Sequence, residues 1–129
     1  MKTDIRDIQD IKLLVNNFYD QVKVDELLAP IFLEKIPGDW APHLDTMYRF
    51  WNAALFGVRE YVGNPFMKHM HLPIQQEHFE RWIDLFYKTI DALFEGPVAD
   101  EAKRRAMIMA HTFYQRMNIR QDLSPLPPL

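Results

Sequence analysis

The sequence predicts an all-α protein, and two observations carry that prediction. Apolar residues recur at three- and four-residue steps along most of the chain, which is the spacing of one helical face. No stretch alternates apolar and polar residues as a half-buried strand would, and there is no internal repeat. A chain of 129 residues can bury one core, so we expect a single domain over 1–122 and a Pro-rich, disordered tail over 123–129.

The first helical stripe runs from Ile5 to Val22. It could form one helix or two helices that meet near Asp10, and its acidic residues lie toward the start, where the helix dipole favours them. A short apolar piece follows at 27–32 and is interrupted by Pro30.

The second long stripe runs from Trp40 to Val58. Asp39 is a candidate cap for this helix, and Pro42 is tolerable in its first turn. The Gly-Asn-Pro sequence at 63–65 is expected to end it.

The strongest helical pattern in the chain runs from Phe79 to Phe94. Gly96 fits a C-terminal cap for this helix, and Pro97 fits the first position of the next one. That last helix reaches at least Met117 and carries small residues that permit close packing.

Composition and missing motifs exclude several classes of protein. A net charge of -3 gives no basis for binding nucleic acid or an anionic membrane. The absence of cysteine excludes disulfides, thiolate nucleophiles and iron–sulfur clusters. GxGxxG, P-loop, HExxH and ExxH motifs are all missing. The chain starts without the apolar stretch of a signal peptide and has no run that could span a bilayer, so we expect a cytoplasmic protein.

The most distinctive polar residue is His69, in a segment bracketed by Pro65 and Pro73. On a short helix His69 would share one face with Phe66 and Met70, through the spacing i, i+3, i+4. Imidazole is a natural ligand for haem iron, and such neighbours suit an apolar cofactor. A lone histidine between helices is more often a hydrogen-bonded or surface residue, so His69 alone decides little.

Four further polar residues bear on the same idea. His71 would face away from His69 on a helix, so we expect it to be solvated or near a charged edge of the cofactor. Tyr19, His43 and Trp82 fall on apolar helical faces. Each also has a plainer interpretation, as a core residue with a surface hydrogen bond or as simple packing. Their order along the chain, each on a different helix or connector, favours a shared pocket over unrelated core positions.

With these residues in this order, the sequence resembles the truncated haemoglobins of the third group. The resemblance extends from about the first predicted helix to the last. The strings that carry the resemblance are Phe18-Tyr19, Leu28-Ala29-Pro30-Ile31-Phe32, His43 with Phe50-Trp51, Lys68-His69 through Leu72-Pro73, and Phe79 to Trp82 followed by Leu85-Phe86. The paired glycines of the other two groups are missing. The resemblance implies a truncated globin fold, a two-over-two helical sandwich around haem b.

The resemblance also implies roles for the polar residues. His69 matches the proximal ligand of the iron, and Tyr19 matches the distal tyrosine that hydrogen-bonds a bound ligand. Trp82 matches the distal tryptophan, whose indole N–H also reaches the ligand. His43 matches the distal histidine that gates access.

The remaining cofactor contacts follow from the same match. Phe32 matches the phenylalanine on the haem face, and Met47 matches the apolar residue over the iron. The other expected contacts are Phe50, Phe66, Lys68, Met70, His71 and Phe79. The Met70-His71 pair departs from the less basic residues expected there, so Lys68 and His71 are both candidates for the haem propionates.

The implied function is reversible binding of O2, NO and CO at a pentacoordinate iron, with no catalytic residue. One alternative is a haem enzyme with peroxidase-like or nitric-oxide-dioxygenase activity. A second alternative is a helical interaction module without a cofactor. The expected partners are the gas and an unidentified reductase, and we expect a monomer that binds neither nucleic acid nor membrane.

Overall fold

The computed structural model describes the backbone of residues 2–58 and 75–123, and the side chains of 2–58 and 75–115. Its helices are α1 (Ile8–Val22), α2 (Ala29–Lys35), α3 (Ala41–Phe56), α5 (Gln76–Leu93) and α6 (Pro97–Leu123). Across these ranges the only pairing of strand type is an isolated bridge between Thr3 and Phe94. The all-α prediction is confirmed. Of the predicted tail at 123–129, Leu123 is the last residue of α6, and residues 124–129 lie outside the described part of the chain.

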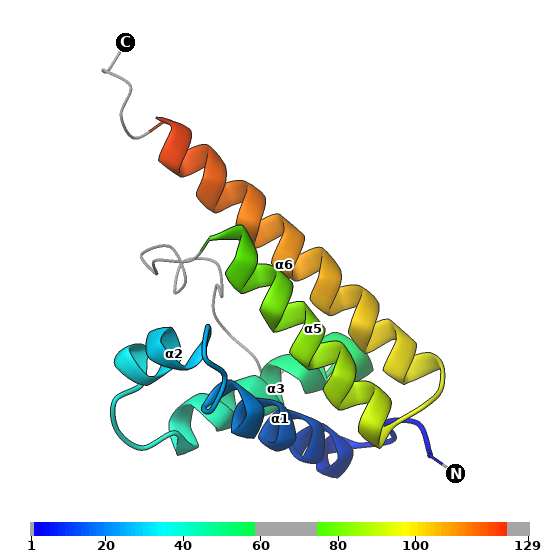
Figure 1. The fold of residues 1–129 in the computed structure, drawn as a ribbon. Coiled ribbons are helices and arrows are strands. Elements are labelled where there is room, and N and C mark those ends of the chain that lie inside the picture. The colour runs from blue at the N-terminus through cyan, green and yellow to red at the C-terminus, as the bar shows by residue number, and fades with distance from the viewer. Residues whose placement is uncertain (1, 59–74, 124–129) are drawn as a thin grey trace.

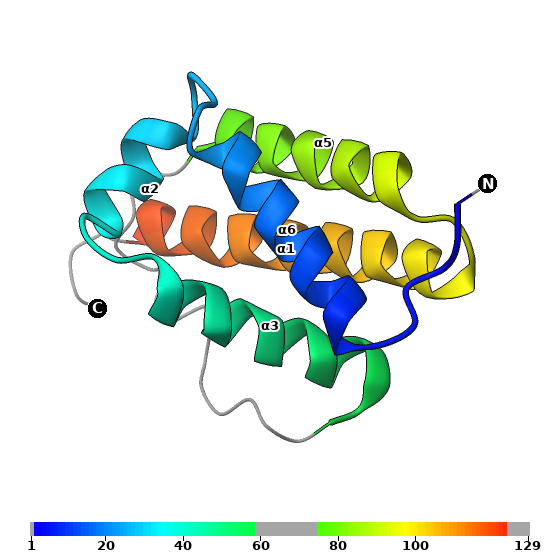
Figure 2. The ribbon, with the colours of Figure 1, turned by 90° about the horizontal axis from the view of Figure 1, so that it is seen from below.

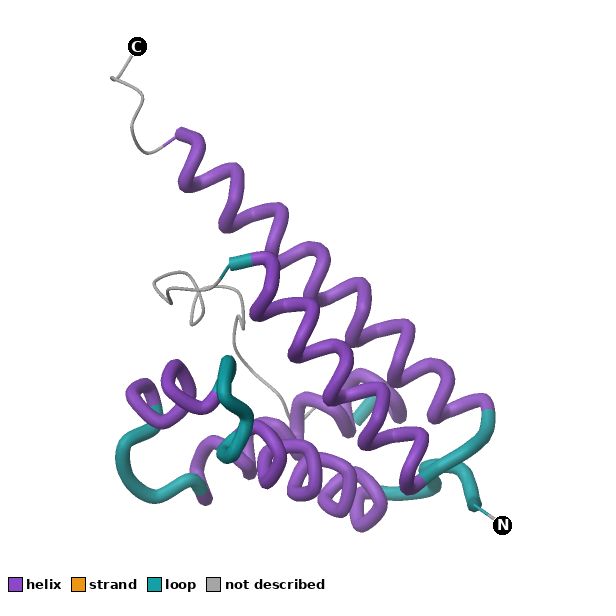
Figure 3. Tube along the Cα trace, in the orientation of Figure 1, coloured by secondary structure: helices purple, strands orange, loops and turns teal. Residues whose placement is uncertain are grey.

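The four long helices form two layers of two. α1 and α3 make one layer, and α5 and α6 run side by side in the other (Figure 1). Figure 2 shows α1 crossing the second layer, with α2 beyond one end of α1. α1 contacts α5 and α3 contacts α6, which gives the two-over-two arrangement. The tube in Figure 3 shows how short the connections between α1 and α2 and between α5 and α6 are. Within the described part, no helix has the length and apolarity needed to cross a membrane.

The helical stripes read from the sequence meet in one core between the layers. α1 gives it the largest buried face: Ile11, Leu14, Val15, Phe18 and Val22. Phe86 and Ile90 of α5 pack against that face. The small residues of α6 are four buried alanines, Ala99, Ala102, Ala106 and Ala110, which let this helix approach its neighbours closely.

The first stripe forms one continuous helix, which decides between the two possibilities that the sequence leaves open. Asp7 caps α1 by accepting hydrogen bonds from the backbone N–H groups of Gln9 (3.1 Å) and Asp10 (3.2 Å). Ile5 is buried but precedes the helix.

Pro30 begins a helix rather than interrupting an apolar segment. It lies in the first turn of α2, where the backbone N–H that proline lacks would have no partner inside the helix. The carboxylate of Asp25 supports this turn by accepting from the N–H groups of Leu27 (3.1 Å) and Leu28 (3.0 Å). It also accepts from Arg81 of α5 at 2.7 Å. Burial alone would raise the pKa of Asp25, but these hydrogen bonds outweigh it and the pKa lies below its ordinary value.

The ends of α3 differ from the prediction. Trp40, not Asp39, occupies the cap position, although the Asp39 carboxylate still accepts from the N–H of Ala41 at 3.0 Å. The helix ends at Phe56, so the predicted end at 63–65 is wrong. The cause is Gly57, whose φ of 70° is the left-handed conformation that terminates helices, and whose N–H donates to Ala53 at 3.0 Å.

Gly96 is not the cap of α5, as the sequence suggested, but a point of contact with the N-terminal segment. α5 ends at Leu93, and Phe94 is extended. The carboxylate of Asp4 lies against Gly96 and accepts from the N–H groups of Val98 (2.9 Å) and Ala99 (2.8 Å). Asp4 therefore caps α6, which begins at Pro97 as predicted.

Gly96→Ala is expected to lower the free energy of unfolding by about 3 kcal/mol, through backbone strain and loss of the Asp4 cap. The φ of Gly96 is 146°, and an added Cβ would lie 2.5 Å from the Asp4 Cγ. Gly57→Ala is the matched control, since nothing lies within 4 Å of its Cβ position. It should cost only about 1 kcal/mol. Urea unfolding measures both, and equal losses would contradict the Asp4 contact.

Candidate functional site

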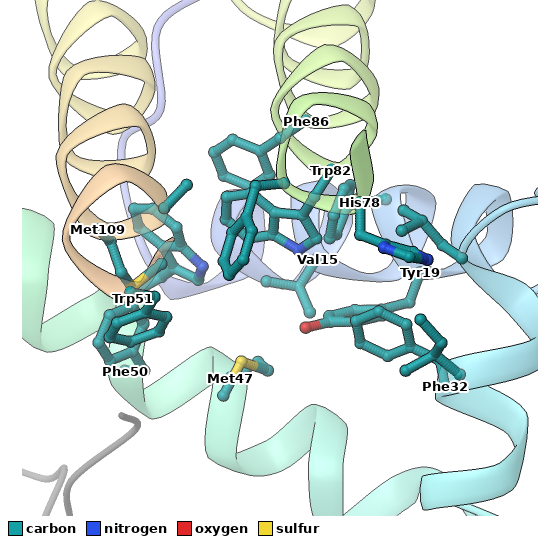
Figure 4. Close-up of a pocket in the computed structure, with 16 residues that line it drawn as sticks. Val15, Tyr19, Phe32, Met47, Phe50, Trp51, His78, Trp82, Phe86 and Met109 are labelled. Atoms are coloured by element: carbon teal, nitrogen blue, oxygen red, sulfur yellow. The ribbon is translucent and has the colours of Figure 1, made fainter. Parts of the chain in front are cut away.

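An apolar pocket lies between the two layers, and all five described helices contribute to its wall (Figure 4). The space between these side chains is about 860 Å³, part of it open to solvent. None of the described residues that line it is Asp, Glu, Lys or Arg. Its few polar groups are the side chains of Tyr19, Trp51, His78 and Trp82.

The pocket brings together six of the residues that the sequence singled out. They come from four helices and are Tyr19, Phe32, Met47, Phe50, Phe79 and Trp82. The proposed iron ligand His69 lies outside the described residues, and so do Phe66, Lys68, Met70 and His71. Their roles stay predictions.

Tyr19 is held firmly at the wall of the pocket. Its side chain is 6% exposed, and its ring packs edge-on against Phe18 (centroids 5.0 Å apart) and Phe32 (6.0 Å). Its hydroxyl points into the open space (Figure 4). Burial raises the pKa of Tyr19 because the phenolate would lose its hydration. The hydroxyl therefore stays protonated and able to donate at neutral pH.

Tyr19 differs from the other described tyrosines in its hydrogen bonding. The hydroxyls of Tyr48, Tyr87 and Tyr114 each bond a protein oxygen, on Asn16, Lys103 and Gln76 respectively. Among residues 2–58 and 75–115, the Tyr19 hydroxyl has no such partner. The hydroxyl is therefore available to donate to a molecule in the pocket, a hydrogen bond worth about 1–3 kcal/mol in apolar surroundings.

Trp82 is fixed by a stack of aromatic rings. It lies parallel to Phe86, with centroids 5.4 Å apart and an interplanar angle of 3°. Phe86 in turn stacks on Trp51 at 5.0 Å. Phe18 meets the Trp82 ring edge-on at 5.5 Å, so the indole cannot turn without disturbing the core. Its nitrogen faces the pocket (Figure 4).

His43 lies beside Tyr19 and is not among the described residues that line the pocket. Its half-buried ring meets the Tyr19 ring edge-on, with centroids 5.0 Å apart and an interplanar angle of 84°. His43 therefore adjoins Tyr19 but is set back from the space that Tyr19 faces, and its role as a gate stays a prediction.

His78 lines the pocket and was missed from the sequence. It lies four residues before Trp82 and therefore on the same face of α5, which is the signal that could have found it. Its Nδ1 accepts a hydrogen bond from the N–H of Gln75 at 2.9 Å. The neutral imidazole therefore carries its proton on Nε2.

The residues present fit a large, apolar cofactor better than a bare metal ion. In the described part of the chain, no group of three or more His, Cys, Asp or Glu side chains could hold a metal. The walls are aromatic and aliphatic, with the sulfur atoms of Met47 and Met109 among them. An apolar space faced by the Tyr19 hydroxyl and the Trp82 indole nitrogen suits a haem that carries a small polar ligand.

Comparisons with known proteins agree with this site. The family model described as bacterial-like globin matches residues 5–119. A group 3 truncated haemoglobin from Campylobacter jejuni is 32% identical over 117 residues, which cover 88% of this chain and 92% of that protein. The crystal structure of a group III truncated haemoglobin from Campylobacter jejuni matches with a TM-score of 0.84 and 30% identity. That match covers 91% of this chain and 95% of the other.

Proposed function

Because the chain belongs to the bacterial-like globin family, as a haem-binding group III truncated haemoglobin, we propose that it binds O2 and other diatomic gases reversibly on haem b. The observation that supports this most is the Tyr19 hydroxyl, which faces an apolar pocket and bonds none of the described residues. The protein acts as a monomer in the cytoplasm, with an unidentified reductase to keep the iron reduced.

Haem supplies an iron atom with a coordination position at which a diatomic gas binds. His69 is the proposed protein ligand of that iron. Tyr19 and Trp82 would donate hydrogen bonds to the gas, from the Tyr19 O–H and the Trp82 indole N–H. In apolar surroundings each such bond would be worth about 1–3 kcal/mol, because little solvent competes for the donor.

The apolar side chains hold the cofactor and keep water out. Phe32 and Met47 pack on the haem from α2 and α3, with Phe50 and Phe79 completing the described wall. The other proposed contacts are Phe66, Lys68, Met70 and His71. Since none of the described lining residues is charged, the hydrogen-bond donors act in surroundings of low polarity.

Spectroscopic titration with haem tests this function. The purified protein is expected to take up one haem per chain, and the reduced form should change its visible spectrum reversibly with O2, CO and NO. Failure to take up haem would support the interaction module without a cofactor. Haem uptake without reversible gas binding would also contradict the proposal.

An enzyme on the same scaffold is the second candidate, because Tyr19 and Trp82 place two donors at one pocket. Two donors aimed at a bound ligand can also assist cleavage of an oxygen–oxygen bond. Turnover of peroxide or NO in the presence of a reductant distinguishes the enzyme from the carrier. Sustained turnover that falls together with gas stabilisation in Tyr19→Phe would favour the enzyme.

His43→Ala is expected to speed gas association and to change O2 dissociation much less. The imidazole packs on Tyr19 and not against the pocket, so its removal opens a path without removing a donor. Association should rise roughly two- to tenfold, the factor that corresponds to a ring contact of about 0.5–1.5 kcal/mol. Flash photolysis measures both rates. Unchanged association with much faster O2 dissociation would make His43 a ligand donor and not a gate.

A further inference from the structure

Trp40 holds His43 in its position beside Tyr19. Trp40 lies at the cap position of α3, three residues before His43. Its ring meets the His43 ring edge-on, with centroids 5.8 Å apart and an interplanar angle of 90°. It also contacts Tyr19 at 5.9 Å. The three rings therefore form one cluster in which each contacts the other two, and the His43 ring stands nearly at right angles to both Tyr19 and Trp40.

Lys23 contacts the Trp40 ring as well. Its Nζ lies 4.6 Å from the centroid of the Trp40 ring, which is the geometry of a cation–π contact. Lys23 is the cap residue at the end of α1, and its backbone N–H donates to Tyr19 at 2.9 Å. The contact thus connects the end of α1 to the start of α3, where the side chain of the cap residue Trp40 itself makes no capping hydrogen bond.

We propose that Lys23 and Trp40 are positioning residues that hold His43 against Tyr19 and thereby set the rate of gas access to the pocket. The inference rests on the proposed function, because it assumes that the gas enters the pocket past His43. The imidazole can turn outward only by giving up its contacts with both rings. Because the Lys23 contact connects Trp40 to the end of α1, it limits how far Trp40 can move with the imidazole.

The chain supplies a matched control for this contact. Lys12 of α1 lies over the ring of Tyr48 of α3, with Nζ 5.6 Å from the centroid. This second cation–π pair joins the same two helices, and its ring is neither of the two, Tyr19 and Trp40, that meet the His43 ring edge-on. Lys12→Met and Lys23→Met each remove one charge and keep a long apolar side chain.

The test is the CO association rate after flash photolysis of the haem-loaded protein. Lys23→Met should speed association roughly two- to fivefold, the factor for an exposed cation–π contact, whereas Lys12→Met should leave it unchanged. Lys23→Arg should restore the rate of the parent protein, and Trp40→Leu should exceed Lys23→Met. In the His43→Ala background, none of these substitutions should change the rate further.

The results separate the inference from the proposed function. If His43→Ala speeds association but Lys23→Met does not, the positioning role is wrong and the gate stands. If Lys23→Met acts equally with and without His43, it does not act through the imidazole and the inference is again overturned. If His43→Ala itself has no effect, the gate and the inference both fail. Should Trp40→Leu not fold, the Lys23 and Lys12 variants carry the test alone.

Discussion

His69→Ala is expected to weaken haem binding by at least about 100-fold, so that the variant loses its colour on gel filtration. Loss of an outer-shell partner of a metal ligand already costs about 10- to 100-fold in affinity, and loss of the ligand itself should cost more. We expect His69 at the proximal position because the sequence around it resembles the group III truncated haemoglobins, and imidazole is the axial ligand of globins. Haem retention is measured from the visible spectrum, and added imidazole should restore it.

Two other histidines serve as controls for this assignment. His71→Ala removes the neighbouring imidazole in the same segment and should keep its haem. His78→Ala removes an imidazole that lines the described pocket, together with its hydrogen bond to Gln75. It should cost some stability at the start of α5 while haem is retained. Loss of haem in either control, with retention in His69→Ala, would move the ligand role to the other histidine.

Tyr19→Phe and Trp82→Phe are each expected to speed O2 dissociation roughly ten- to a hundredfold. That factor corresponds to the loss of a hydrogen bond of about 1–3 kcal/mol in an apolar pocket. CO is a poorer hydrogen-bond acceptor, so its dissociation should change much less. Stopped-flow replacement measures both gases. Equal effects on O2 and CO would point to a steric role for these side chains.

A second tyrosine separates ligand binding from stability. Tyr87→Phe removes a hydroxyl that donates to the carbonyl of Lys103 at 3.1 Å. It should lower the free energy of unfolding by about 1 kcal/mol and leave O2 dissociation unchanged. Tyr19→Phe should do the reverse: the haem-free protein should be no less stable, because no described residue bonds the Tyr19 hydroxyl. A clear loss of stability in haem-free Tyr19→Phe would mean that the hydroxyl serves the protein.

Much of the fold could be predicted because the buried faces of the long helices follow helical periodicity. The stripe that ends at Val22 and the pattern around Phe86 became α1 and α5, and their buried faces are those stripes. The pocket followed for the same reason. Tyr19 and Trp82 stand on apolar faces, and packing two such faces together brings them to one space.

What the sequence did not predict depends on contacts between distant segments. The Asp4 cap on α6 joins residues more than 90 positions apart, and no local pattern signals it. The end of α3 is set by one glycine, Gly57, in the left-handed conformation. The sequence has stronger turn-forming residues further along, at 63–65, and these suggested a later end. The cluster that His43 forms with Tyr19 and Trp40 likewise depends on how α3 packs on α1.

The most direct test of the central claim is the infrared stretching frequency of CO bound to the reduced protein. The frequency depends on the electric field at the ligand, and a hydrogen-bond donor lowers it. If the free hydroxyl of Tyr19 faces the ligand, Tyr19→Phe should raise the frequency, while Tyr87→Phe should leave it unchanged. Frequencies that are the same in the parent protein, Tyr19→Phe and Trp82→Phe would contradict the account, because neither donor would then reach the gas.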